Sequence, residues 1–149
     1  MKFKFPLQKV LEHRKIKENL AQKDFQEVVT LLTEEQARLE AMTGQVQNAH
    51  QQAGSLSQMG GAQGPALSQI HEFLKGQEVR IQRQRQKVQE IEKLVESKRE
   101  ILRQAALEYK IMEKMRENKF EEYRAERLSN DQKEMDEQSI LRFKAVKES

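Results

Sequence analysis

The chain has 149 residues, of which 36% are hydrophobic and 34% are charged, with a formal net charge of +3 and a mean hydropathy of -0.91. Such a polar composition excludes a large globular core, and two prolines with six glycines are too few for a turn-rich β fold. The absence of cysteine excludes disulfides and thiolate sites, and no stretch approaches the ~20 apolar residues of a membrane span.

The first predicted element is a helix from about residue 6 to residue 53. It begins at Pro6, and no further proline interrupts it before the glycine-rich stretch. The N-terminus has basic residues but no apolar run like that of a signal peptide, so we expect a cytoplasmic protein. A heptad register on this helix places mostly apolar residues at positions a and d: Lys4, Leu7, Leu11, Arg14, Glu18, Ala21, Phe25, Val28, Leu32, Glu35, Leu39, Met42, Val46, Ala49, Ala53 and Leu56.

A turn is predicted over about residues 54–66. The segment from Gly54 to Pro65 holds four of the six glycines and no charged residue. Each glycine costs a helix interior roughly 1 kcal/mol, so we expect the first helix to end here and a second helix to follow.

The second predicted helix runs from about residue 67 to residue 147. Its a and d positions are again mostly apolar as far as Met112: Leu67, Ile70, Leu74, Gln77, Ile81, Gln84, Val88, Ile91, Val95, Lys98, Leu102, Ala105, Tyr109 and Met112. The pattern then stops near Arg116, where the first helix would run out if the two helices were antiparallel. We therefore predict one all-α domain over residues 1–149, a long two-stranded antiparallel coiled-coil hairpin with a helical overhang over residues 117–149. A dimer or a four-helix assembly remains an alternative.

The sequence contains no motif for catalysis or nucleotide binding, and we expect no enzyme activity, no cofactor and no small-molecule substrate. His13, His50 and His71 lack metal-site spacing, although His50 and His71 would approach each other near the turn. Two basic stretches, one over residues 2–23 and one from Arg80 to Lys87, are compatible with nucleic acid, but no reading module accompanies them. We expect no nucleic-acid partner.

Apolar side chains also gather at the predicted turn. Phe73 lies off the a/d seam, so we expect it to be partly exposed and, with its neighbours, to form a docking surface. The alternative is that these residues only cap the end of the coil. The proposed tip contacts are Met59, Leu67, Ile70, Phe73 and Leu74.

The opening residues carry a family resemblance. The pattern of Phe3, Phe5, Leu7, Val10, Leu11, Arg14 and Glu18 resembles the N-terminus of FliJ, a cytoplasmic protein of the flagellar type III export apparatus. The length, the coiled-coil pattern, the central break and the charged C-terminal helix also look like that family. Stalk proteins of virulence secretion systems share this plan.

The resemblance implies a function in flagellum biogenesis, and with it chemotaxis. A FliJ-like chain would be a stalk, similar to the γ subunit of rotary ATPases, in the pore of the export ATPase hexamer. It would promote assembly and activity of that ATPase, link it to the membrane export gate protein and handle export chaperones, at the inner face of the cell membrane. The family motif would fall here on Phe5, Leu7, Val10, Leu11, Arg14 and Glu18 as ATPase-ring contacts. The alternatives are a generic scaffold coiled coil, and a helical-hairpin chaperone or nucleic-acid binder.

Overall fold

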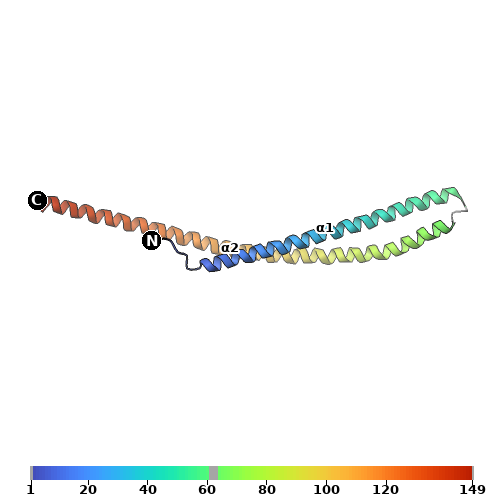
Figure 1. Cartoon of the computed structure of the whole chain (residues 1–149), viewed down its shortest axis with the longest axis horizontal. Helices are drawn as coiled ribbons and strands as arrows, with labels where there is room; N and C mark the ends of the chain where they lie inside the picture. The colour runs from blue at the N-terminus through green and yellow to red at the C-terminus, as the bar shows by residue number, and fades with distance from the viewer. Residues whose placement is uncertain (1, 61–63, 149) are drawn as a thin grey trace. The chain divides into compact units, whose positions relative to one another are not determined.

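The structure, a computed structural model, describes residues 2–60 and 64–148 and contains two helices in this part of the chain. Helix α1 spans Gln8–Met59 and helix α2 spans Gly64–Glu148 (Figure 1). The described residues include no strand, so the predicted all-α class is confirmed.

The helix ends follow from local chemistry. The backbone N–H of Gln8 donates to the carbonyl oxygen of Phe5 at 3.1 Å, so Pro6 lies in the turn that leads into α1. Gly60 follows α1 with a φ of 92°, the left-handed conformation that glycine supplies after a helix C-terminus. Gly64 and Pro65 open α2, where the missing N–H of proline costs nothing.

The end of α1 differs from the sequence expectation. The helix was expected to stop near residue 53, but it continues through Gly54 to Met59. Ala53 and Leu56 are half-buried on the seam, and their packing offsets the roughly 1 kcal/mol that Gly54 costs. Part of the predicted turn, residues 61–63, lies outside the described residues.

By their contacts, residues group into two compact units. One is Leu20–Arg103, which contains most of α1 and about the first half of α2. The other combines Met1–Asn19 with Gln104–Ser149. The expectation of a single domain over residues 1–149 stays a prediction.

Within Leu20–Arg103, the two helices lie side by side and antiparallel (Figure 1). Contacts between them include Met42 with Gln77, Glu35 with Gln84, and Phe25 with Arg99. As the residue number rises on α2 it falls on α1, which confirms the predicted hairpin.

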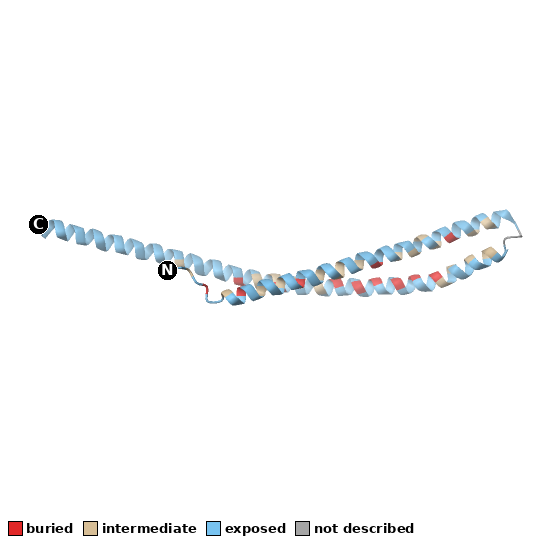
Figure 2. Cartoon of the chain, in the orientation of Figure 1, coloured by how far each residue is buried: buried red, intermediate tan, exposed pale blue. Residues whose placement is uncertain are grey.

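The predicted heptad seam is the buried face of both helices. Every a and d position from Leu11 to Leu56 and from Leu67 to Met112 is buried or half-buried (Figure 2). From Glu113 to Glu148 the residues are exposed, with Tyr123 half-buried as the exception. The seam therefore ends where the sequence pattern fails, and α2 remains helical beyond that point.

Candidate functional site: the terminal cluster and the tip of the hairpin

An apolar cluster forms where the chain start meets α2, in the unit Met1–Asn19 with Gln104–Ser149. Phe5, Leu11 and Met112 are each 8% exposed, and Phe3 and Tyr109 pack against them. Phe5 comes from the segment before α1, so this segment is anchored by its side chains rather than by regular secondary structure. Each fully buried side chain of this kind contributes about 1.5–3 kcal/mol, so the cluster holds the chain start on α2.

A second aromatic contact extends this cluster along α2. The ring of Phe3 lies 5.3 Å from that of Phe120 and 5.4 Å from that of Tyr123, measured between centroids. The guanidinium of Arg116 lies 5.9 Å from the Phe3 ring, and its Nε donates to Oε1 of Gln8 at 3.2 Å. These contacts fix the chain start on the first turns of α2 beyond the seam.

Charged side chains cover the cluster. Arg14 and Lys17 of α1 both donate to Oε2 of Glu108 on α2, at 2.5 and 3.2 Å. These two hydrogen bonds hold the pKa of the Glu108 carboxyl below its usual value, and the bond from Lys17 has the larger effect. The Tyr109 ring lies 4.8 Å from the Lys15 ammonium, and a hydrogen bond with Glu113 raises the pKa of the Tyr109 phenol.

The structure separates the expected ATPase-ring residues into two groups. Phe5 and Leu11 are buried inside the chain, and Arg14 is half-buried in its ion pair with Glu108. Leu7 and Val10 face solvent, with 39% and 37% of their surface exposed. The motif therefore supplies an internal anchor as well as an outward surface, which its sequence alone did not distinguish.

Glu18, the last residue of the motif, lies half-buried beside Lys15. Its Oε2 is 3.8 Å from the Lys15 ammonium, and this oxygen is buried without a hydrogen-bond partner among the described residues. The carboxylate belongs to the seam of the hairpin rather than to its outer surface.

At the tip, the expected contact residues divide in the same way. Met59 is 74% exposed and Phe73 is 38% exposed, which confirms the expected partial exposure of Phe73. Leu67, Ile70 and Leu74 are half-buried on the seam. A groove beside Phe73 is lined mainly by uncharged side chains: Gln45, Asn48, Ala49, Gln52, Gln69, Ile70 and Phe73.

The absence of charge at the tip extends well beyond the predicted turn. No Asp, Glu, Lys or Arg occurs from residue 41 to residue 71, in a chain that is 34% charged. Its only titratable side chains are His50 and His71, which line one groove together with Lys75, Glu78 and Arg85. A count of charge along the chain would have shown this.

Three buried polar side chains interrupt the apolar seam of Leu20–Arg103. Gln84 donates to the backbone oxygen and to Oε2 of Glu35, at 3.0 and 2.6 Å, and Gln77 donates to Oε1 of Gln45 at 2.9 Å. The Gln84 bond, together with Lys87 and Arg38, lowers the pKa of the Glu35 carboxyl although burial raises it. Polar layers of this kind can specify the register of a coiled coil.

No group of three or more metal-ligating side chains gathers in the part of the chain that the structure describes. Nor is any helix within residues 2–60 and 64–148 long and apolar enough to cross a membrane. The described residues offer two chemically different regions instead. One is the lysine-rich terminal region, residues 2–19 packed on α2, and the other is the tip, where residues 41–71 carry no Asp, Glu, Lys or Arg.

Comparison with known proteins identifies the family. No curated protein and no solved structure matches the chain. The model of the family described as flagellar FliJ protein matches residues 3–148, nearly the whole sequence. The match agrees with the resemblance of the opening residues and with the helical hairpin. The chain therefore belongs to the FliJ family and is a flagellar export-related protein.

Proposed function

We propose that this chain is the stalk of the flagellar export ATPase hexamer and couples that ATPase to the membrane export gate. In this role it promotes assembly and activity of the ATPase, handles export chaperones and is held at the inner face of the cell membrane. The family itself is a non-enzymatic export component, so the chain acts by binding. The observation that carries the proposal is the contrast between two binding regions, one basic and one without charge.

The terminal region is the candidate contact with the ATPase ring. Leu7 and Val10 are exposed in a segment that is rich in basic side chains: Lys2, Lys4, Lys9, Lys15 and Lys17. Phe5 and Leu11 position this surface from beneath, and the pairing of Arg14 with Glu108 fixes α1 on α2. In this proposal the ring contacts the outward side chains, and the buried ones hold them in place.

The tip is the candidate contact with the export gate. Exposed Met59 and Phe73 can enter an apolar recess of a partner, and the amide side chains around them offer hydrogen bonds without charge. The half-buried Leu67, Ile70 and Leu74 support this surface from the seam.

The ring contact is tested by the ATP hydrolysis rate of the partner ATPase with the purified chain. The variant Leu7→Glu/Val10→Glu places two carboxylates on the proposed contact surface, and we expect it to lose the stimulation. The control Ile16→Glu/Leu20→Glu makes the same change on the same helix at two residues that are each 58% exposed. Equal stimulation by both variants would contradict the assignment.

The gate contact is tested by binding of the cytoplasmic part of the gate protein. We expect Met59→Ala/Phe73→Ala to weaken binding, and Val79→Ala, at a residue that is 52% exposed, to leave it unchanged. Unchanged binding by the double variant would remove the tip from the proposal. A generic scaffold would instead form a stable oligomer and have no effect on the ATPase.

A further inference from the structure

The C-terminal part of α2 carries several of the most exposed apolar side chains among the described residues. Leu128 is 62% exposed, Met135 is 68% exposed and Phe143 is 68% exposed, and neither α1 nor the chain start packs on them. Leu128, Met135 and Ser139 lie on one face of the helix, because their spacings of seven and four residues each come close to whole turns. An isolated helix of this kind is marginal in water, so a covering partner would stabilise it.

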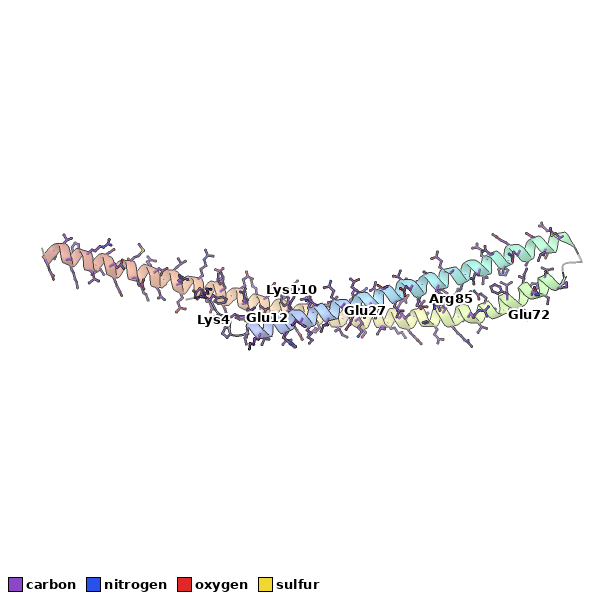
Figure 3. All side chains as sticks on the ribbon, in the orientation of Figure 1. Lys4, Glu12, Glu27, Glu72, Arg85 and Lys110 are labelled. Carbon is purple, nitrogen blue, oxygen red and sulfur yellow. The ribbon has the colours of Figure 1, made fainter. Side chains whose placement is uncertain are left out.

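Charge divides along this same segment. Four acidic side chains and one basic side chain lie in its first part: Asp131, Lys133, Glu134, Asp136 and Glu137. The following stretch, residues 138–147, contains Arg142, Lys144 and Lys147 and no acidic residue. No charged side chain between Asp131 and Lys147 forms an ion pair within the described part of the chain. Both charge blocks are therefore available to a partner. Figure 3 shows the side chains of this C-terminal part of α2 projecting from the ribbon.

We propose that a second copy of this chain covers the segment, with residues 131–147 of the two copies paired antiparallel around Ser139. A two-fold axis near Ser139 places the acidic block of each copy against the basic block of the other. Ser139 is small and allows the helices to approach at the crossing, with Met135 near the partner's Phe143. In the antiparallel arrangement the two helix dipoles also point in opposite directions, so they attract each other.

The helix period assigns the individual ion pairs. Asp131 and Arg142 are eleven residues apart, close to three turns, so they lie on one flank of the face of Met135 and Ser139. Asp136 and Lys147 have the same spacing and lie on the other flank. In an antiparallel two-fold pair each flank meets the same flank of the partner. Asp131 then shares one flank with the partner's Arg142, and Asp136 shares the other flank with the partner's Lys147; the members of each pair are offset by about 7.5 Å along the axis, and symmetry repeats both pairs.

The acidic block decides against an anionic membrane as the occupant. The stretch of residues 138–147, with exposed Phe143 and three basic side chains, would suit such a surface by itself. The four acidic side chains immediately before it would be repelled. A second copy uses both blocks, whereas a membrane uses only one.

The inference goes beyond the proposed function and adds a form of regulation to it. If the terminal region enters the ATPase ring, a second copy paired on residues 131–147 would obstruct that entry. The paired form would then be a resting state. Self-association can be measured with the chain alone, so it stands or fails separately from any effect on the ATPase.

The test is sedimentation velocity of the full chain over a range of concentrations. We expect the wild type to form a concentration-dependent dimer. The variants Arg142→Glu/Lys147→Glu and Asp131→Lys/Asp136→Lys should each raise its dissociation constant at least about tenfold, because like charges replace four ion pairs. An equimolar mixture of the two variants should restore the dimer. At the four pairing positions one variant then carries only acidic side chains and the other only basic ones, so the two attract each other.

The control is Arg83→Glu/Arg85→Glu, which makes the same charge change at two exposed residues of the other unit and should leave the dimer intact. Circular dichroism checks that each variant keeps its helix content. A wild type that stays monomeric, a dimer that survives either variant, or a mixture that fails to pair would each overturn the proposal. So would a monomer that binds vesicles of phosphatidylglycerol and loses this binding in Arg142→Glu/Lys147→Glu, because the segment would then belong to a membrane.

Discussion

Removal of the Gln84 amide should destabilise the hairpin by an amount that the structure allows us to estimate. Gln84 is 8% exposed and lies on the seam, where its Nε2 donates to the backbone oxygen of Glu35 and to its carboxylate. In Gln84→Ala both acceptors lose this donor in a place that water reaches poorly, since Glu35 is 5% exposed. Lys87 and Arg38 still contact Oε1 of Glu35, but neither contacts Oε2.

A buried acceptor left without its donor costs about 1–3 kcal/mol. For a chain of this size each kcal/mol lowers the melting temperature by about 2–4 °C, so we expect a decrease of about 2–12 °C. Replacing both partners, in Glu35→Leu/Gln84→Leu, should restore or exceed the wild-type stability, because an apolar layer leaves no polar group unpaired. The size of the loss in Gln84→Ala therefore reflects the orphaned carboxylate oxygen of Glu35 and the lost methylene packing together, because the backbone oxygen keeps its bond within the helix.

Thermal unfolding followed by circular dichroism at 222 nm measures these changes. The matched control is Gln86→Ala, two residues further on α2, where the side chain is exposed. A melting temperature for Gln84→Ala equal to that of Gln86→Ala would refute the reasoning. A double leucine variant less stable than Gln84→Ala would do so as well.

Three further predictions follow from the same contacts. The lowered pKa of Glu108 contributes stability at pH values above the usual carboxyl pKa of 4.5. This stability is lost as the pH falls through the lowered pKa of Glu108. The melting temperature of Glu108→Gln should therefore fall less in acid than that of the control Glu90→Gln, which keeps Glu108. Gly60→Ala should lower the melting temperature because φ is 92° there, whereas Gly54→Ala, inside α1, should raise it by the equivalent of about 0.5–1 kcal/mol. Binding through the tip should weaken less with salt concentration than binding through the basic terminal region, because residues 41–71 carry no Asp, Glu, Lys or Arg and the nearest guanidinium, that of Arg80, lies 5.8 Å from the Phe73 ring.

The sequence predicted the seam because the heptad period depends on few local details. Positions a and d from Leu11 and from Leu67 onward are buried or half-buried even where they are polar, as Gln77 and Glu35 are. Leu7 is an exception: it was placed at position d, but it lies before the start of α1 and faces solvent. A heptad register holds only where the backbone is helical.

Other features required the structure. The extension of α1 through Gly54 depends on packing against α2, which a local propensity does not include. The burial of Phe5 depends on how the segment before α1 lies on Met112. The bonds that Gln84 makes to Glu35 join residues far apart in the chain, so no spacing in the sequence indicates them.

The proposed stalk role is tested most directly by the rate of ATP hydrolysis of the export ATPase. The purified chain is titrated into the ATPase, and the oligomeric state of the ATPase is followed by light scattering at the same time. The proposed function predicts that the rate and the hexamer fraction rise together and saturate near one chain per hexamer. A rate that does not respond, or saturation near one chain per ATPase subunit, would contradict it.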